Sequence, residues 1–419
     1  MRGGSLINMK PLTVILATLC LAVSWYYAVS LAARGNVGLK SGQSNDFFLL
    51  WNASRAVLHG VDPYSDEIAR QNQIEEYGTT AVAVGEQCDY RLVYPIQATF
   101  PVLPLAWLDF RFADKIALIL MTAVVALSIG WFRGLWDGTT LLYALLAFAS
   151  YPVIVALQMH QPTLLFFGLM LGSFALVRSR HLILAGCVAA LACGKPQIAL
   201  PVLLPMLIWS LAEWRQRKRF AIALVATVLG LFLLSCVISP GWIPRWLDSL
   251  HGYSQYVHPS LVVGFLGAKA GLVVSGMLAL GLAAALWLNR DRDLAFQIAL
   301  STAVFSLLIQ GEFYNMAILL VPAVWVADHV KRLHDSGPVN QIALAFVRIA
   351  LAEFWLANAV GAVLFHTTPL GKTIAWQISV DMTFPLVGAL ALMMIVQLFP
   401  QSRLLHEQVD TMDRSSALT

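Results

Sequence analysis

Long apolar runs separated by short polar breaks recur along almost the whole chain. Many of these runs approach the roughly 20 residues that an α-helix needs to cross the hydrocarbon core of a bilayer. Only helices and closed barrels satisfy their backbone hydrogen bonds there, so we predict an all-α polytopic membrane protein with about twelve transmembrane helices. The predicted spans are residues 11–33, 113–132, 138–157, 160–178, 182–194, 196–212, 219–238, 266–288, 294–309, 313–328, 340–364 and 380–399.

The apolar segment 93–110 is the exception to this pattern, because it carries three prolines. We predict a re-entrant or interfacial segment there. Cytoplasmic loops carry an excess of Lys and Arg. With the N-terminus inside and 93–110 not crossing, all basic clusters fall in the cytoplasm, whereas a crossing 93–110 would move Arg215–Arg219 outside. These clusters are Arg178–His181, Arg215–Arg219, Arg290–Arg292 and Lys331–Arg332.

This topology predicts one transmembrane domain over residues 1–400 and a cytoplasmic tail over 401–419. The first outer loop, 34–112, is large. The polar turns at Gln158–Gln161, Lys195–Gln197 and Gly311–Asn315 and the loops 239–265 and 365–379 emerge on the same outer face. Polar residues from distant stretches of the chain therefore converge there.

Composition agrees with a bilayer environment. Of 419 residues, 59% are hydrophobic and 12% are charged, where soluble domains are about a quarter charged. Four of the five cysteines lie in apolar runs, so no disulfide framework is expected. The first apolar run is longer than that of a signal peptide and is expected to be a retained span. No basic, aromatic surface suited to nucleic acid stands out.

The first outer loop contains the most informative stretch, DFFLLWNASRAVLHGVDPY, at 46–64. Its apolar residues recur at helical spacing, with Asn52, Arg55 and His59 on the other face, which predicts an amphipathic helix over 46–59 at the outer membrane surface. Ser44 or Asn45 can cap its start.

Asp46 lies in the first turn of this helix, where the helix dipole favours an ionised carboxylate. Such a carboxylate, close to the lipid boundary, is a candidate general base for a substrate hydroxyl. First-turn acids are common, so a purely capping role is the alternative.

Two polar breaks between later spans offer binding groups. Gln158, His160 and Gln161 form a turn that suits sugar hydroxyls or phosphate, or simply caps a helix. Lys195 lies between two spans. Placing a lysine at membrane depth costs free energy and therefore suggests a function, here an ammonium that stabilises a phosphate leaving group. The alternative is that its side chain snorkels to the outer interface.

Tyr314 and Asn315 lie in a further polar break, and His258 lies in a loop rich in Trp and Tyr that otherwise looks like an interfacial aromatic belt. The histidines show no metal-ligand spacing, and no Walker A or Rossmann motif is present. We therefore expect neither a metal nor a cofactor.

The stretch 46–64 resembles the first loop of glycosyltransferase family 87, which has the GT-C membrane fold. Further similarities follow in the family's order: Tyr94–Pro95, the turn Gln158–Gln161, the stretch Ala185–Pro196 and FYNMAILLVPAVW at 313–325. The resemblance covers roughly residues 40–330. The family includes polyprenyl-phosphate-mannose-dependent mannosyltransferases and related arabinofuranosyltransferases.

The resemblance implies a GT-C-like bundle and an inverting hexosyltransferase or related enzyme in the plasma membrane. A polyprenyl-phosphate sugar would be the donor and a lipid or glycan the acceptor, with membrane lipids as further partners. It implies that Asp46 is the base and that Lys195 contacts the donor phosphate. The chain departs from the family at Met159–Pro162 and has Asn315 where an Asp is usual. A transporter or flippase of a lipid-linked saccharide is the alternative, although no repeated halves are evident.

Overall fold

The computed structural model describes residues 45–78, 90–254, 260–309, 312–367 and 385–399, and these ranges are helical, without β-strands. The helices are α2 (Asp46–Leu58), α3 (Asp66–Tyr77), η1 (Ile96–Thr99), α4 (Leu103–Ala106), α5 (Phe110–Arg133), α6 (Gly138–Phe148), α7 (Tyr151–Gln158), α8 (Thr163–Arg178), α9 (Leu182–Ala192), α10 (Pro196–Ala212), α11 (Trp214–Ile238), α12 (Trp242–Tyr253), α13 (Leu261–Leu266), α14 (Ala268–Leu288), α15 (Leu294–Leu308), η2 (Phe313–Leu319), α16 (Leu320–Asp335) and α17 (Pro338–Thr367). A further apolar helix covers Pro385–Val396.

Within the described ranges three helices, α5, α11 and α14, are long and apolar enough to cross a membrane. A fourth span is possible if α6 and α7, which meet at 66°, count as one broken helix. Most other predicted spans correspond to shorter apolar helices, so the count of about twelve stays a prediction. The predicted first span, 11–33, lies outside the described residues.

The α5 helix shows how sequence pattern becomes packing. Ala113, Ala117, Met121 and Val125 repeat every four residues and are fully buried, because residues four apart share one helix face. Ile119, on another face, is 67% exposed. Exposed apolar faces are also extensive on α11 and α14, and such surfaces suit contact with lipid.

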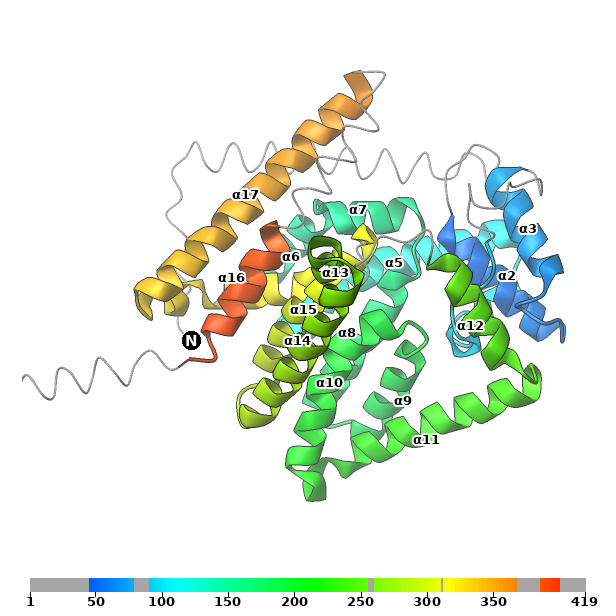
Figure 1. The fold of residues 1–419 in the computed structure, drawn as a ribbon, viewed down its shortest axis with the longest axis horizontal. Helices are drawn as coiled ribbons and strands as arrows, with labels where there is room; N and C mark the ends of the chain where they lie inside the picture. Colours follow the sequence, from blue (N-terminus) through cyan, green and yellow to red (C-terminus); the bar gives the residue numbers. More distant parts are fainter. Residues whose placement is uncertain (1–44, 79–89, 255–259, 310–311, 368–384, 400–419) are drawn as a thin grey trace, which may run out of the picture.

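Small residues let the central helices pack closely. In α9, Gly186 faces α11, where an added Cβ would come within 2.5 Å of the Phe220 carbonyl oxygen. Close backbone approach over small residues is the usual packing mode of membrane helices. In Figure 1 the helices α8, α9 and α10 form the middle of the molecule, and α2 and α3 lie at the end away from α17.

The α2 helix is more deeply embedded than predicted. It begins at Asp46, as its sequence suggests, and contacts α3, α4, α5 and η1. Asn52, expected on a polar outer face, is 6% exposed and donates to Asn72 of α3 at 2.9 Å. The expectation of a one-sided surface helix is therefore wrong for Asn52, because α3 covers that face.

Two boundaries also differ from the predictions. The basic run Arg215–Arg219 was expected between spans but lies in the first turns of α11, since Arg, Lys and Gln are good helix formers. The predicted span 313–328 starts as the tight helix η2 and becomes α-helical at Leu320. Within 93–110 the chain forms only η1 and α4, so this segment is broken rather than one continuous helix.

Candidate active site

The start of α2 is fixed against the turn between α7 and α8. The Asn45 side chain caps α2 by accepting from the Phe48 backbone N–H at 3.2 Å. The Asp46 backbone N–H donates to the Met159 carbonyl at 2.9 Å. A contact between residues so far apart in sequence places the Asp46 carboxylate beside the polar turn.

The turn itself has an unusual backbone. His160 has φ 48°, in the left-handed region that non-glycine residues seldom adopt. Two backbone bonds hold it: His160 N–H to the Leu157 carbonyl at 3.2 Å and Gln161 N–H to the Ala156 carbonyl at 2.7 Å. The side chains of His160 and Gln161 are both buried. Strained, buried polar turns of this kind are common at functional sites.

Gln161 connects the candidate base to the buried lysine. Its amide nitrogen donates to an oxygen of the Asp46 carboxylate. Its amide oxygen accepts from Lys195 Nζ at 3.1 Å and from the Tyr94 hydroxyl at 3.3 Å. A carboxylate only accepts and an ammonium only donates, so these two neighbours fix which way the amide faces.

Lys195 occupies the break between α9 and α10 and is 2% exposed. Its ammonium also donates to the Thr163 hydroxyl, and it lies over the rings of Tyr94 (5.5 Å) and Tyr314 (5.0 Å). Both rings give cation–π stabilisation. Two of its three hydrogens thus have oxygen acceptors among the described residues, which leaves one for a ligand.

Burial lowers the pKa of Lys195 to about 7, although the charges of Asp46 and Glu312 raise it. Desolvation disfavours the ammonium, and the two carboxylates only partly compensate. Burial and the charge of Asp46 raise the pKa of Tyr94 well above its usual range, so its phenol remains protonated and can donate.

A cavity of about 420 Å³ opens beside Lys195. Its wall combines polar groups with apolar side chains. The wall includes Tyr94, Lys195, Trp246, Tyr253, Tyr314 and Asn315. Pockets of this size with a few polar groups in an apolar wall are typical of small-molecule sites. Asp46 is not part of this wall; Gln161 links it to the lysine that is.

A second polar cluster lies on the other side of the turn. His160 Nδ1 is 2.6 Å from Asp114 Oδ1, and the Asn45 amide donates to the same oxygen at 3.0 Å. His160 Nε2 is buried with no hydrogen-bond partner among the described residues. The carboxylate of Asp114, on α5, therefore fixes the orientation of the imidazole next to the candidate base.

The structure brings together most of the predicted site residues. Asp46, Gln161, Lys195 and Asn315 belong to one hydrogen-bonded network, in which Thr163 donates to Asn315 Oδ1 at 3.2 Å. Tyr314 joins through its ring. Gln158 is only half-buried and makes no side-chain hydrogen bond within the described ranges. His258 lies outside the described residues.

Three residues of the site were not singled out from the sequence alone. Thr163 follows Pro162 directly at the start of α8, where a threonine is an ordinary capping residue, so the sequence gives no signal for its role. Tyr94 was noted only within a family motif. Asp114 is an acid inside a predicted span, and intramembrane acids are functional candidates by default. Across the described residues, no three His, Cys, Asp or Glu side chains form a group that could hold a metal.

Comparison with known proteins gives one match. A family model for glycosyltransferase family 87 matches residues 92–311, a little over half of the chain. The chain belongs to glycosyltransferase family 87. No curated protein and no solved structure matches it.

Family membership makes this protein a membrane glycosyltransferase. The matched range contains Tyr94, His160, Gln161 and Lys195 but begins after Asp46 and ends before Tyr314. It is the tertiary structure that joins these outlying residues to the matched ones, through the Gln161 bridge and the contacts of Lys195.

Proposed function

We propose that the protein transfers a sugar, mannose or a pentose such as arabinofuranose, from a polyprenyl-phosphate donor to a hydroxyl of a lipid-linked or glycan acceptor. The transfer proceeds with inversion on the extracytoplasmic face of the plasma membrane. Family membership supports glycosyl transfer, and the exposed apolar helix faces support a lipid-borne donor.

One observation carries the proposal. A carboxylate and a buried ammonium, Asp46 and Lys195, bond to opposite ends of one amide, that of Gln161. Transfer from a sugar phosphodiester needs a base for the acceptor and positive charge for the departing phosphate. The bridge links the carboxylate to the ammonium, and the ammonium lines a cavity of about 420 Å³.

In this mechanism the Asp46 carboxylate removes the proton from the acceptor hydroxyl as its oxygen attacks the anomeric carbon. The bond between the anomeric carbon and the phosphate oxygen breaks, and the polyprenyl phosphate leaves with the bonding electron pair. Lys195 donates a hydrogen bond to the phosphate as negative charge develops. The phosphate remains ionised, so no general acid is required.

The other network residues have supporting roles. Thr163 accepts from the ammonium and is itself held by Asn315, and the rings of Tyr94 and Tyr314 lie close to the ammonium. Tyr314 and Asn315 also line the cavity and would contact the donor. His160, oriented by Asp114, lies next to Gln161 and provides a further hydrogen-bonding group for phosphate or sugar.

A transporter or flippase of a lipid-linked saccharide is the competing function. A carboxylate held at a cavity can also bind a transported sugar, so the network alone does not separate the two. Membership of a glycosyltransferase family favours the enzyme. The two functions differ in outcome, because only the enzyme forms a new glycosidic bond.

The deciding experiment uses the purified full chain with labelled polyprenyl-phosphate mannose or arabinose and a set of lipid acceptors. Formation of a labelled glycolipid supports the proposal. Asp46→Asn should abolish transfer while donor binding is retained, since the amide fills the same space but cannot take the proton.

Glu67→Gln is the matched control, because Glu67 is also a first-turn acid but is exposed on α3. Its activity should equal that of the wild type. Full activity of Asp46→Asn would remove Asp46 from the mechanism, and movement of donor across the bilayer without any product would favour the transporter.

A further inference from the structure

A second pocket lies at the far ends of the helices that build the candidate site. Along α5, Asp114 and Arg133 are separated by 19 residues, or about 28 Å of helix. Along α8, Thr163 and Arg178 are separated by about 22 Å. Arg133 and Arg178 line a pocket of about 350 Å³ that also receives side chains from α10, α11, α15 and α16. Four arginines line it: Arg133, Arg178, Arg180 and Arg217.

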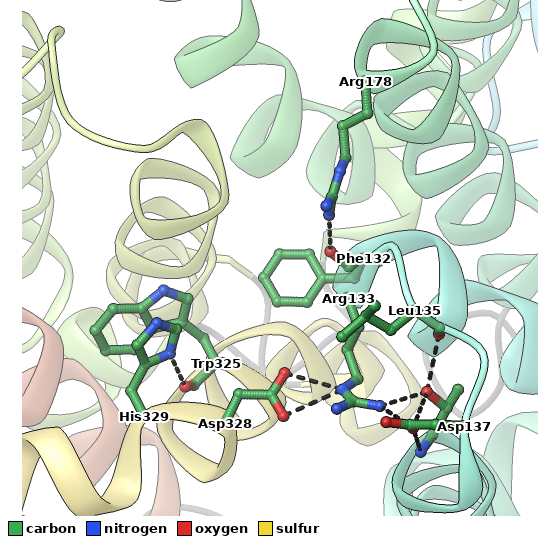
Figure 2. A network of polar contacts seen from close by, with 9 residues as sticks. Phe132, Arg133, Leu135, Asp137, Arg178, Trp325, Asp328 and His329 are labelled. Carbon is green, nitrogen blue, oxygen red and sulfur yellow. Dashed lines mark hydrogen bonds and ion pairs between the residues drawn. The ribbon is translucent and has the colours of Figure 1, made fainter. Parts of the chain in front are cut away.

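Arg133 links three helices through two salt bridges. Its guanidinium binds Asp328 of α16 at 2.9 Å and Asp137, the cap of α6, at 2.6 Å, as Figure 2 shows. Both partners are acids, so the charge of Arg133 is neutralised within the protein. Arg133 therefore supplies the wall of the pocket rather than a free charge.

Arg178 and Arg180 differ from Arg133 because neither has a carboxylate partner among the described residues. Arg178 donates to the Phe132 carbonyl at 2.8 Å and lies over the Phe174 ring at 5.7 Å. It also packs on Gly134, where a Cβ would overlap the guanidinium. Arg180 is exposed and has φ 64°. One guanidinium is thus held in place with its charge uncompensated, and a second lies two residues away.

The floor of the pocket contains further donors without acceptors. Arg217 pairs with Glu213 at 2.5 Å and lies over the Trp209 ring, but its Nε has no partner within the described part of the chain. Trp325 is 3% exposed, lines the pocket, and its indole N–H likewise has no partner there. Buried donors without acceptors are costly, so such groups require an explanation.

The acids in the wall do not balance these cations. Asp328 is already bound to Arg133, which leaves Asp293, exposed at the start of α15, as the other acid of the lining. Basic residues at the ends of membrane helices are common and usually face solvent. Here four arginines line one cavity with aromatic walls, and Arg178, although exposed, is fixed there by three separate contacts.

We propose that this pocket binds the phosphate of an anionic phospholipid headgroup. The planar guanidinium matches phosphate oxygens, and Arg178 and Arg180 present two of them together. Basic pockets between membrane helices are known headgroup sites. On the side of α11 that carries Arg217, Val228 and Phe232 are 38% and 37% exposed, and these apolar side chains suit the acyl chains. This site is independent of the proposed reaction.

Native mass spectrometry of the delipidated full chain in detergent tests the inference, with phosphatidylglycerol as the probe and phosphatidylcholine as the neutral comparison. The wild type should prefer phosphatidylglycerol. Each cationic side chain near an anionic lipid contributes about fivefold in affinity, so Arg178→Gln with Arg180→Gln should weaken phosphatidylglycerol binding about 25-fold. Phosphatidylcholine binding should not change.

The matched control is Arg215→Gln with Arg219→Gln, which removes two charges from exposed positions in the first turns of α11 that do not line the pocket. It should retain the preference. If both double variants lost phosphatidylglycerol affinity equally, the attraction would be a general surface effect and the proposal would be overturned. An unchanged preference for phosphatidylglycerol in the pocket variant would overturn it too. Arg180→Gln alone, at an exposed position with no internal contact to lose, gives about a fivefold loss even if the double variant misfolds.

The bound phosphate could belong to a membrane lipid or to a small soluble phosphate ester, and glycerol phosphate distinguishes the two. It carries the headgroup chemistry without acyl chains, so it should bind far more weakly than phosphatidylglycerol. Binding of glycerol phosphate as tight as that of the lipid would overturn the assignment to a membrane lipid.

Discussion

Raising the pH should switch off transfer by deprotonating Lys195. Its ammonium is buried, and this burial lowers its pKa to about 7 against the opposing charges of Asp46 and Glu312. Only the protonated form can stabilise the departing phosphate. The value of kcat/KM for the donor, which reports the free enzyme, should therefore fall as the pH rises through about 7.

The size of the effect follows from the titration curve. One pH unit above its pKa about a tenth of an amine is protonated, and two units above it about a hundredth. The expected loss in kcat/KM is thus about tenfold at pH 8 and about hundredfold at pH 9. The phenol of Tyr94 remains neutral over this range because burial and the charge of Asp46 raise its pKa well above the usual 10.

The assay measures initial rates of labelled glycolipid formation at low donor concentration from pH 6 to 9. The kcat/KM of Lys195→Arg, whatever its level, should be the same at pH 9 as at pH 6, because a guanidinium does not deprotonate in this range. Glu312→Gln should move the decline to lower pH, because a carboxylate that favours the ammonium has been removed. Lys269→Arg, at an exposed position on α14, is the matched control and should leave the profile unchanged.

A flat profile in the wild type, or the same decline in Lys195→Arg, would refute this reasoning. Deprotonation of Lys195 does not itself destabilise the folded protein. The folded pKa of Lys195 lies below the unfolded value, so the unfolded chain binds more protons between about pH 7 and 10. This group therefore makes the folded state more stable, not less, as the pH rises, and thermal unfolding of the same samples checks that sign.

Three further variants test the network and the packing. Gln161→Leu should lower kcat/KM at least tenfold, since it removes two hydrogen bonds to charged groups worth about 1.5–3 kcal/mol each; steady-state rates at matched protein level measure this. Asp114→Asn should lower kcat about tenfold with little change in KM, because the charge that orients His160 is lost, and unchanged kinetics would leave His160 a structural turn residue. Gly186→Ala should cost about 1–3 kcal/mol in the free energy of unfolding, because its Cβ meets the backbone of α11. Gly230→Ala, which meets no atom within 4 Å, should be neutral or stabilising by up to about 1 kcal/mol; equal effects at the two glycines would contradict the packing argument.

Much of the helical framework could be predicted because most of the helices carry their own apolar run; the polar helix α3, which carries none, was not predicted. The breaks could be predicted too, since Pro162 and Pro196 begin new helices directly after polar residues. Boundaries were less predictable where polar residues are good helix formers, as at Arg215–Arg219 in α11. The tight geometry of η2 has no comparable sequence signal; in the folded protein Met316 and Leu319 are buried in the core, and η2 packs against α7 and α15.

Individual site residues were predictable where a residue type is unusual for its setting. A lysine between apolar helices and an acid at the start of a helix both drew attention for that reason. Thr163 and Asn45 gave no such signal, because a threonine after a proline and an asparagine before a helix are ordinary caps. Their importance depends on what faces them from other helices.

The sequence by itself determined the class of protein, the approximate helices and the two charged groups, Asp46 and Lys195, because these depend on local composition and on the cost of burying charge. Only the tertiary structure decided that Gln161 joins these groups and that Asp114 holds His160. The same structure decided that the arginines at the far end of α5 and α8 share one pocket. Hydrogen bonds of this kind link residues 34 to 115 positions apart, and no local pattern records which distant partner a polar side chain will meet.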